Sequence, residues 1–130
     1  MRLLPDTSVW VDYLRGRDAA TVAELDRYLE HESVLICGPV IAELLAGTAP
    51  QRRDDLWLAI GSLPWAAIDQ PAWRSIGEVW NDLQHAGVSV PLTGISIAVA
   101  AANSGAELWT NDHDFERIRE VLPELELHSS

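Results

Sequence analysis

The sequence predicts an α/β fold in which helices cover both faces of one mainly parallel β-sheet. Short apolar runs typical of buried strands alternate with longer segments of helical periodicity along the whole chain. Glycine and proline stand at most of the junctions between them. No internal repeat, linker or low-complexity segment divides the chain, so we expect residues 1–130 to form a single domain.

The strands and helices can be assigned in order from these runs. Pro5 lies at the margin of the first strand, because proline cannot donate to a sheet ladder. Proline is also favoured in the first turn of a helix, as at Pro39 and Pro71. The predicted strands are residues 2–5, 33–37, 65–68, 107–110 and about 125–127. The predicted helices are a short one ending near residue 16, then about 20–31, 38–47, 52–63, 71–87, 94–104 and a short one after residue 114.

Charge and composition restrict the possible functions. The formal net charge is −11, which argues against broad electrostatic binding of nucleic acid, because phosphate contacts depend on lysine and arginine. That inference weakens if the acids gather in one pocket, where they would bind cations and let a metal ion meet the phosphate. All nine basic residues are arginines, and they are scattered along the chain.

The N-terminal region argues against a leader or membrane segment. Asp6, Asp12 and Asp18 interrupt its apolar residues, so we expect a cytoplasmic protein with no membrane association. The single cysteine, Cys37, cannot form an internal disulfide and lies in an apolar run, which favours burial over reactivity.

Acidic residues follow several predicted strands. Asp6 comes directly after the first strand, Glu43 lies in the helix after the second, and Asp112 and Asp114 follow the strand at 107–110. In open parallel sheets the ligand site lies beyond the carboxyl ends of the strands, so these side chains could converge. Carboxylates without a histidine or cysteine cluster select Mg²⁺ or Mn²⁺ over Zn²⁺.

Each of these residues also has a purely structural interpretation. Asp6 could cap the first helix, and Asp112 could belong to an N-capped loop. Glu43 favours function, because an unpaired charge between Ala42 and Leu44 would be costly in such an apolar turn. His113 is interpreted as a solvated neighbour. The six tryptophans indicate core or interface positions: Trp10, Trp57, Trp65, Trp73, Trp80 and Trp109.

Four segments taken together resemble the PIN-domain family, specifically VapC-type toxins of toxin–antitoxin systems. They are Asp6 to Leu14 (DTSVWVDYL), Val40 to Gly47 (VIAELLAG), Ile97 to Ala100 (IAVA) and Thr110 to Phe115 (TNDHDF). The resemblance spans almost the whole chain in the right order. It implies a three-layer α/β/α fold, a homodimer, dependence on Mg²⁺ or Mn²⁺, endoribonuclease activity on an RNA substrate, and inhibition by a cognate antitoxin.

The same resemblance assigns residue roles. It makes Asp6 and Glu43 the first two catalytic, metal-binding acids and Asp112 the late one, with Asp114 close enough to share that assignment. Four neighbours would orient these carboxylates: Thr7, Ser8, Thr110 and Asn111. Such toxins usually have an aspartate where this chain has Gly94, so that position is a vacated ligand position. Pro5, where the family commonly has an aliphatic residue, is a lesser departure.

Two hypotheses follow from the resemblance. In the first, metal held by the acids supports hydrolysis of an RNA phosphodiester. In the second, Gly94 leaves an impaired PIN domain that still binds an antitoxin or RNA. A phosphoryl-aspartate protein is disfavoured, since those families use a lysine near the phosphate and this chain has none. The absence of a Gly-x-x-x-x-Gly-Lys loop leaves nucleotide hydrolysis of that kind unsupported.

Overall fold

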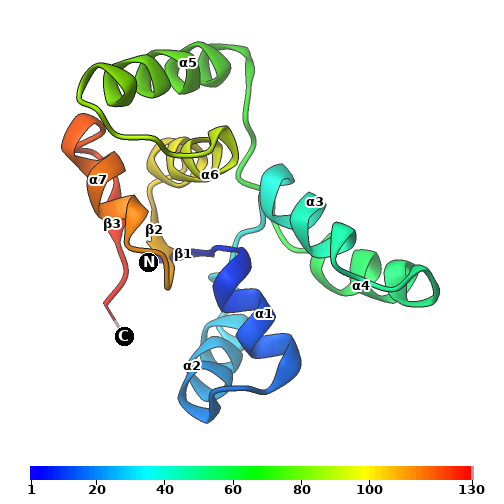
Figure 1. Cartoon of the computed structure of the whole chain (residues 1–130). Helices are drawn as coiled ribbons and strands as arrows, with labels where there is room; N and C mark the ends of the chain where they lie inside the picture. The colour runs from blue at the N-terminus through cyan, green and yellow to red at the C-terminus, as the bar shows by residue number, and fades with distance from the viewer. Residues whose placement is uncertain (130) are drawn as a thin grey trace.

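A computed structural model describes residues 1–129 and has a parallel sheet at its centre (Figure 1). Strands β1 (Arg2–Pro5), β2 (Ala106–Trp109) and β3 (Glu126–Leu127) lie in the order β1-β2-β3, and both pairs are parallel. Pro5 pairs with Trp109 at the end of β1, and the amide of Asp6 continues the ladder by donating to the Trp109 carbonyl at 2.8 Å. The α/β class predicted from the sequence is confirmed.

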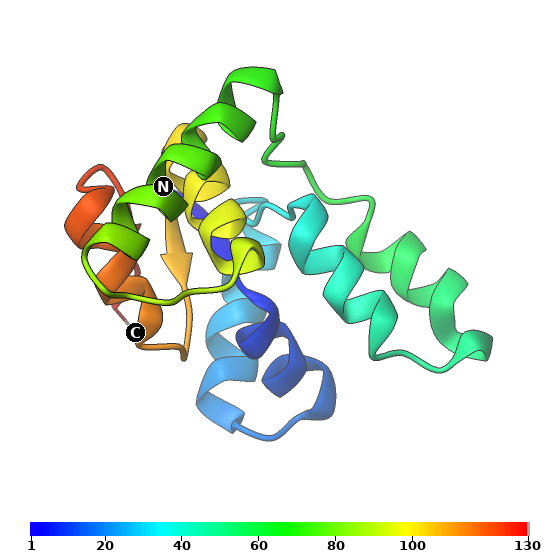
Figure 2. The same ribbon diagram turned by 45° about the horizontal axis from the view of Figure 1, so that its top comes forward.

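Helices cover both faces of this sheet. α5 and α6 lie on one side, and α1 and α2 lie on the other, as Figures 1 and 2 show from two directions. α3 and α4 pack on each other and extend away from the sheet on the side opposite α7 (Figure 1). The helices are α1 (Thr7–Arg15), α2 (Ala19–Glu30), α3 (Gly38–Ala46), the 3₁₀ turn η1 (Pro50–Arg52), α4 (Arg53–Ile60), α5 (Gln70–His85), α6 (Leu92–Asn103) and α7 (Asp114–Val121).

The core is centred on α6. Every side chain from Ile95 to Ala101 in that helix is buried, which explains its apolar, alanine-rich sequence. Three other helices begin at aspartates: Asp6 caps α1, Asp18 caps α2 and Asp69 caps α5, each through a side-chain oxygen that accepts a backbone N–H. α1 ends at Gly16, whose φ of 62° is the left-handed conformation that glycine adopts without strain.

Two of the predicted strands are wrong in extent. Residues 33–37 and 65–68 form only isolated parallel bridges, Leu3 with Val34 and Ile36 with Trp65. The reason is that the segment changes partner within three residues: the Leu35 amide donates to Leu3, and the next amide, of Ile36, donates to Pro64. The segment is nevertheless buried, as predicted, and Cys37 at its end is fully buried at the N-terminus of α3.

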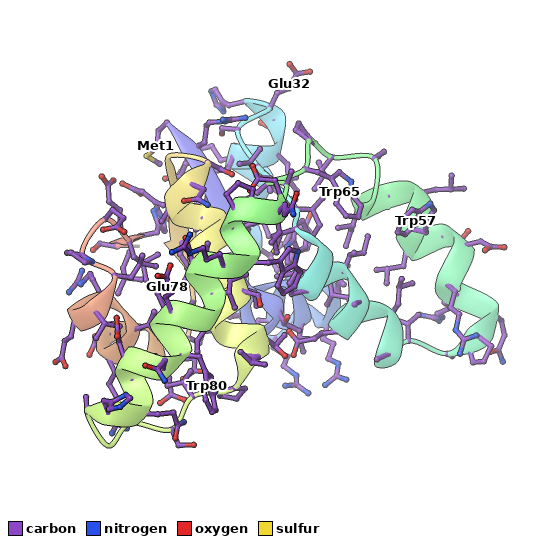
Figure 3. The ribbon with its side chains drawn as sticks, turned by 90° about the horizontal axis from the view of Figure 1, so that it is seen from above. Met1, Glu32, Trp57, Trp65, Glu78 and Trp80 are labelled. Carbon is purple, nitrogen blue, oxygen red and sulfur yellow. The ribbon has the colours of Figure 1, made fainter. Side chains whose placement is uncertain are left out.

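The tryptophans divide into two groups. Trp10 and Trp109 are buried in the core. The other four, on or beside α4 and α5, keep between 39% and 55% of their surface exposed: Trp57, Trp65, Trp73 and Trp80. Figure 3 shows Trp57 and Trp65 on the α4 side and Trp80 on α5. Within residues 1–129, no helix has the length and apolarity needed to cross a membrane.

Candidate active site

Four carboxylates from separate elements line one cavity of about 270 Å³. Asp6 comes from the end of β1, Glu43 from α3, Asp112 from the loop after β2, and Asp114 from the first turn of α7. Gly94, near the N-terminus of α6, also lines the cavity. The structure therefore brings together the acids that the sequence predicted to converge beyond the carboxyl ends of the strands.

Asp6 is the buried member of the set, with 4% of its surface exposed. Its Oδ1 accepts the Ser8 hydroxyl at 2.6 Å and the Val9 amide at 3.2 Å, and its Oδ2 accepts the Thr110 hydroxyl. Burial raises the pKa of Asp6, because it penalises the charged carboxylate, and the hydrogen bonds from Ser8, Thr110 and Val9 oppose that rise. Asp6 thus caps α1 and lines the cavity at once, so its two interpretations are compatible.

The donors to Asp6 act on both of its oxygens. The Ser8 hydroxyl and the Val9 amide donate to Oδ1, and the Thr110 hydroxyl donates to Oδ2. Neutral hydroxyl donors fix the orientation of the carboxylate without neutralising its charge. Ser8 and Thr110 therefore have the geometry of orienting residues.

Glu43 has a different environment from the one inferred from its neighbours. The sequence argument that its charge would be costly in an apolar turn is wrong, because the side chain is exposed. α3 buries Val40, Ile41 and Leu44 on one face, which leaves Glu43 on another. Its Oε1 accepts the Thr7 hydroxyl at 2.7 Å, so Thr7 ties α1 to α3 at the edge of the cavity.

The loop after β2 is held by side chains of α1. The Asn111 amide donates to Ser8 Oγ at 3.2 Å, and the Asp112 amide donates to Thr110 Oγ1 at 2.9 Å. Asp112 Oδ1 accepts the Asp114 amide at 2.9 Å, so the capped-loop interpretation also describes Asp112. His113 is exposed and does not line the cavity.

Asp12 is a residue of this network to which the sequence analysis gave no role. Its Oδ2 accepts the Asn111 side-chain amide at 3.1 Å, which adds a second tether between α1 and the loop that carries Asp112. A sequence signal was available, since Asp12 lies four residues after Ser8 and such residues share a helix face.

Gly94 occupies a position that can accept a side chain. It is the third residue of α6. No side chain among residues 1–129 caps this helix, and its first turn contains no acid. A Cβ built on Gly94 would meet Val90 Cγ1 at 3.6 Å and Phe115 Cζ at 3.9 Å, both ordinary van der Waals contacts. A Cβ at this position therefore fits without displacing its neighbours.

The residue types that line the cavity suit a hard divalent cation, but their side chains are not close enough together to hold one. All four ionisable side chains that line the cavity are carboxylates, the ligands that Mg²⁺ and Mn²⁺ prefer. Among residues 1–129, however, no three or more His, Cys, Asp or Glu side chains are grouped closely enough to hold a metal ion. Gly94 also lines the cavity and contributes no side chain to it.

Comparison with known proteins identifies the family. The family model described as "PIN domain" matches residues 3–121, which is most of the chain. The chain belongs to the PIN-domain family. Among curated members, it is 27% identical over 124 residues to the VapC ribonuclease Mb1587 of Mycobacterium bovis, covering 92% of each protein. It is equally similar, at 27% over 124 residues and 92% of each protein, to ribonuclease VapC11 of Mycobacterium tuberculosis.

Solved structures show the same PIN fold. The DNA-bound VapBC complex of Salmonella typhimurium aligns with a TM-score of 0.79 at 22% identity, covering 98% of this chain and 97% of that one. VapBC2 of Rickettsia felis, bound to a promoter DNA fragment, aligns with a TM-score of 0.78 at 23% identity, covering 98% of both chains. At these identities the alignments establish the three-layer fold of the PIN domain.

Proposed function

We propose that the chain is a metal-dependent endoribonuclease and the toxin component of a VapBC-type toxin–antitoxin pair. The observation that carries the proposal is the cavity in which four carboxylates from β1, α3, α7 and the preceding loop converge. It is supported by similarity to named VapC ribonucleases over 92% of the chain. An RNA target and an antitoxin partner would place the protein in the cytoplasm.

The proposed metal ligands are Asp6, Glu43 and Asp112, with Asp114 able to share the assignment of Asp112. When bound, Mg²⁺ or Mn²⁺ supplies Lewis-acid polarisation of the phosphate and lowers the pKa of an attacking water. The side chains of this chain hold the carboxylates in place, since Ser8 and Thr110 donate to Asp6 and Thr7 donates to Glu43. The Asn111 tethers fix the loop of Asp112.

A second candidate function has an observation in its favour. Gly94 contributes no ligand, and within residues 1–129 no group of three metal-binding side chains is assembled. A PIN domain with an incomplete site would act by binding an antitoxin or RNA. Metal-dependent turnover separates this alternative from the ribonuclease.

The proposal is tested by cleavage of a structured RNA with added Mn²⁺ and with EDTA. Asp6→Asn and Asp112→Asn should each abolish cleavage, because Asn keeps the side-chain shape and removes the charge that binds the ion. The comparison is made in the unaltered chain and in a Gly94→Asp background. Glu120→Gln is the matched control, since Glu120 is exposed on α7 and lies outside the cavity. Retained cleavage with both aspartates changed would show that the site lies elsewhere.

We further propose that the cognate antitoxin inserts a basic side chain, an arginine, into the acidic cavity. A fixed cation there would pair with the carboxylates in place of metal. The structural neighbours are themselves described as VapBC complexes. Asp6→Ala and Glu43→Ala should weaken the complex, and an affinity unaffected by both changes would contradict the idea.

A homodimer is the proposed assembly. Four tryptophans remain between 39% and 55% exposed, which is typical of side chains that anchor an interface. Light scattering at micromolar concentrations should give twice the mass of the chain. A monomer across that range would contradict the proposal.

A further inference from the structure

A second, larger hollow adjoins the acidic cavity. It has a volume of about 790 Å³ and lies between α1, α3 and the segment from η1 to α4. Leu14, Leu44 and Leu56 are among its apolar walls. We call it the arginine groove, because Arg15 and Arg52 also line it.

The arginine groove borders the proposed active site at Glu43. Glu43 lines both hollows, so the two share a wall on α3. A polynucleotide whose scissile phosphate lies at the carboxylates must extend away from them in both directions, since its backbone is unbroken. The arginine groove offers a hollow path that begins at one of the proposed metal ligands.

The two arginines are free to bind a ligand. Both lie on the exposed surface, and within residues 1–129 neither guanidinium forms an ion pair or a side-chain hydrogen bond. Arg74, in contrast, lies 3.8 Å from Glu78 on α5. A guanidinium presents a planar set of donors that matches the oxygens of a phosphate.

The two arginines of the groove stand out because the chain as a whole is strongly acidic. The chain carries a net charge of −11, so its surface as a whole repels nucleic acid, and any phosphate contact must come from a few positioned cations. Asp55 and Glu43 are the carboxylates of the groove. In the proposed function Glu43 binds the metal ion. Asp55 is then the carboxylate of the groove that remains to balance the charges of the two arginines.

We propose that the arginine groove binds the single-stranded RNA next to the cleaved bond. Arg15 and Arg52 would contact its phosphates, and the leucine walls would contact the faces of unstacked bases, which only a single strand exposes. The inference rests on the proposed function for the identity of the ligand as RNA. The arginine groove would be a substrate-binding site separate from the carboxylates, and its contacts would determine the affinity for RNA.

Binding can be measured separately from cleavage. The probe is a fluorescently labelled single-stranded RNA of about ten nucleotides, titrated in EDTA so that no cleavage occurs, at several salt concentrations. Arg15→Gln and Arg52→Gln should each raise Kd roughly three- to tenfold, and each should reduce the slope of log K against log salt by about 0.7. Arg74→Gln removes the same charge from α5, outside the groove, and should change neither quantity by a comparable amount.

Kinetics provide a second measurement in a cleaving background such as Gly94→Asp. There the two groove variants should raise KM and leave kcat nearly unchanged, because the lost contacts hold substrate and transition state alike. If no variant cleaves RNA, the proposed activity is wrong. The titration of labelled RNA in EDTA still decides whether the groove binds RNA.

Three outcomes would overturn the inference. The first is an unaltered chain that does not bind the labelled RNA in EDTA. The second is a loss of affinity in Arg74→Gln equal to that in the groove variants, which would indicate a general charge effect. The third is that the groove variants bind a cognate antitoxin more weakly while their RNA affinity is unchanged, which would assign the groove to a protein partner. Thermal melting of each variant confirms that it is folded.

Discussion

Replacing Gly94 with aspartate should raise both metal affinity and RNA cleavage. Gly94 lines the cavity of the four carboxylates, and its Cβ position is in ordinary contact with Val90 and Phe115. The Cβ of an aspartate therefore fits without a steric clash, and we expect its carboxylate to join those that line the cavity. With this change the cavity would hold one more carboxylate to take part in a metal-binding group.

The expected stability change of the metal-free protein is small. An aspartate in the first turn of α6 interacts favourably with the helix dipole, by about 0.3–1 kcal/mol. Removing the flexibility of glycine contributes about 0.4–1 kcal/mol. Repulsion from the carboxylates already lining the cavity opposes both terms. Metal-free stability should thus stay within about 1–2 kcal/mol of the unaltered chain, and added Mn²⁺ should increase it.

Calorimetry with Mn²⁺ and a cleavage assay measure the two effects. A gain of about 2.7 kcal/mol in transition-state stabilisation corresponds to a hundredfold increase in rate, which a gel assay resolves easily. Gly94→Asn is the matched control, because it adds nearly the same volume without the charge and should gain little. Equal Mn²⁺ affinity and equal cleavage in the aspartate variant and the unaltered chain would refute the interpretation of Gly94 as a vacated ligand position.

Three further predictions concern other residues. Burial raises the pKa of Asp6, so the native metal-free protein keeps the Asp6 proton to higher pH than the unfolded chain does. The free energy of unfolding should therefore fall as pH rises through the raised pKa, and Asp6→Asn should reduce this fall in urea titrations. Burial raises the pKa of Cys37 to about 11, so a thiol reagent at pH 8 should label it only after denaturation. His128 contacts Glu24 at 2.7 Å and Glu107 at 2.9 Å, and His128→Ala should lower unfolding free energy by about 1–3 kcal/mol, with His128→Gln intermediate.

The sequence predicted the fold well where periodicity and capping act locally. Asp6 caps α1 and Gly16 ends it, as the sequence indicated. It failed for the strands at residues 33–37 and 65–68, because an apolar run shows burial but not how many partners its backbone has. Pairing depends on which segments lie alongside, and no local pattern encodes that.

The candidate site shows a similar division. The position of an acid after a strand was enough to place Asp6 and Asp112 at one cavity. The exposure of Glu43 was not predictable from its apolar neighbours, because it depends on which face of α3 packs on the core. The contact between Asp12 and Asn111 joins residues 99 positions apart, so only the tertiary structure reveals it.

Locating a bound Mn²⁺ ion by anomalous diffraction would test the central claim most directly. Crystals soaked in Mn²⁺ should show an anomalous peak in the cavity lined by Asp6, Glu43 and Asp112, with oxygen ligands from these side chains. The peak should strengthen in Gly94→Asp and disappear in Asp6→Asn. A Mn²⁺ ion bound only outside this cavity, or a peak unaffected by Asp6→Asn, would contradict the assignment of these carboxylates as the catalytic metal site.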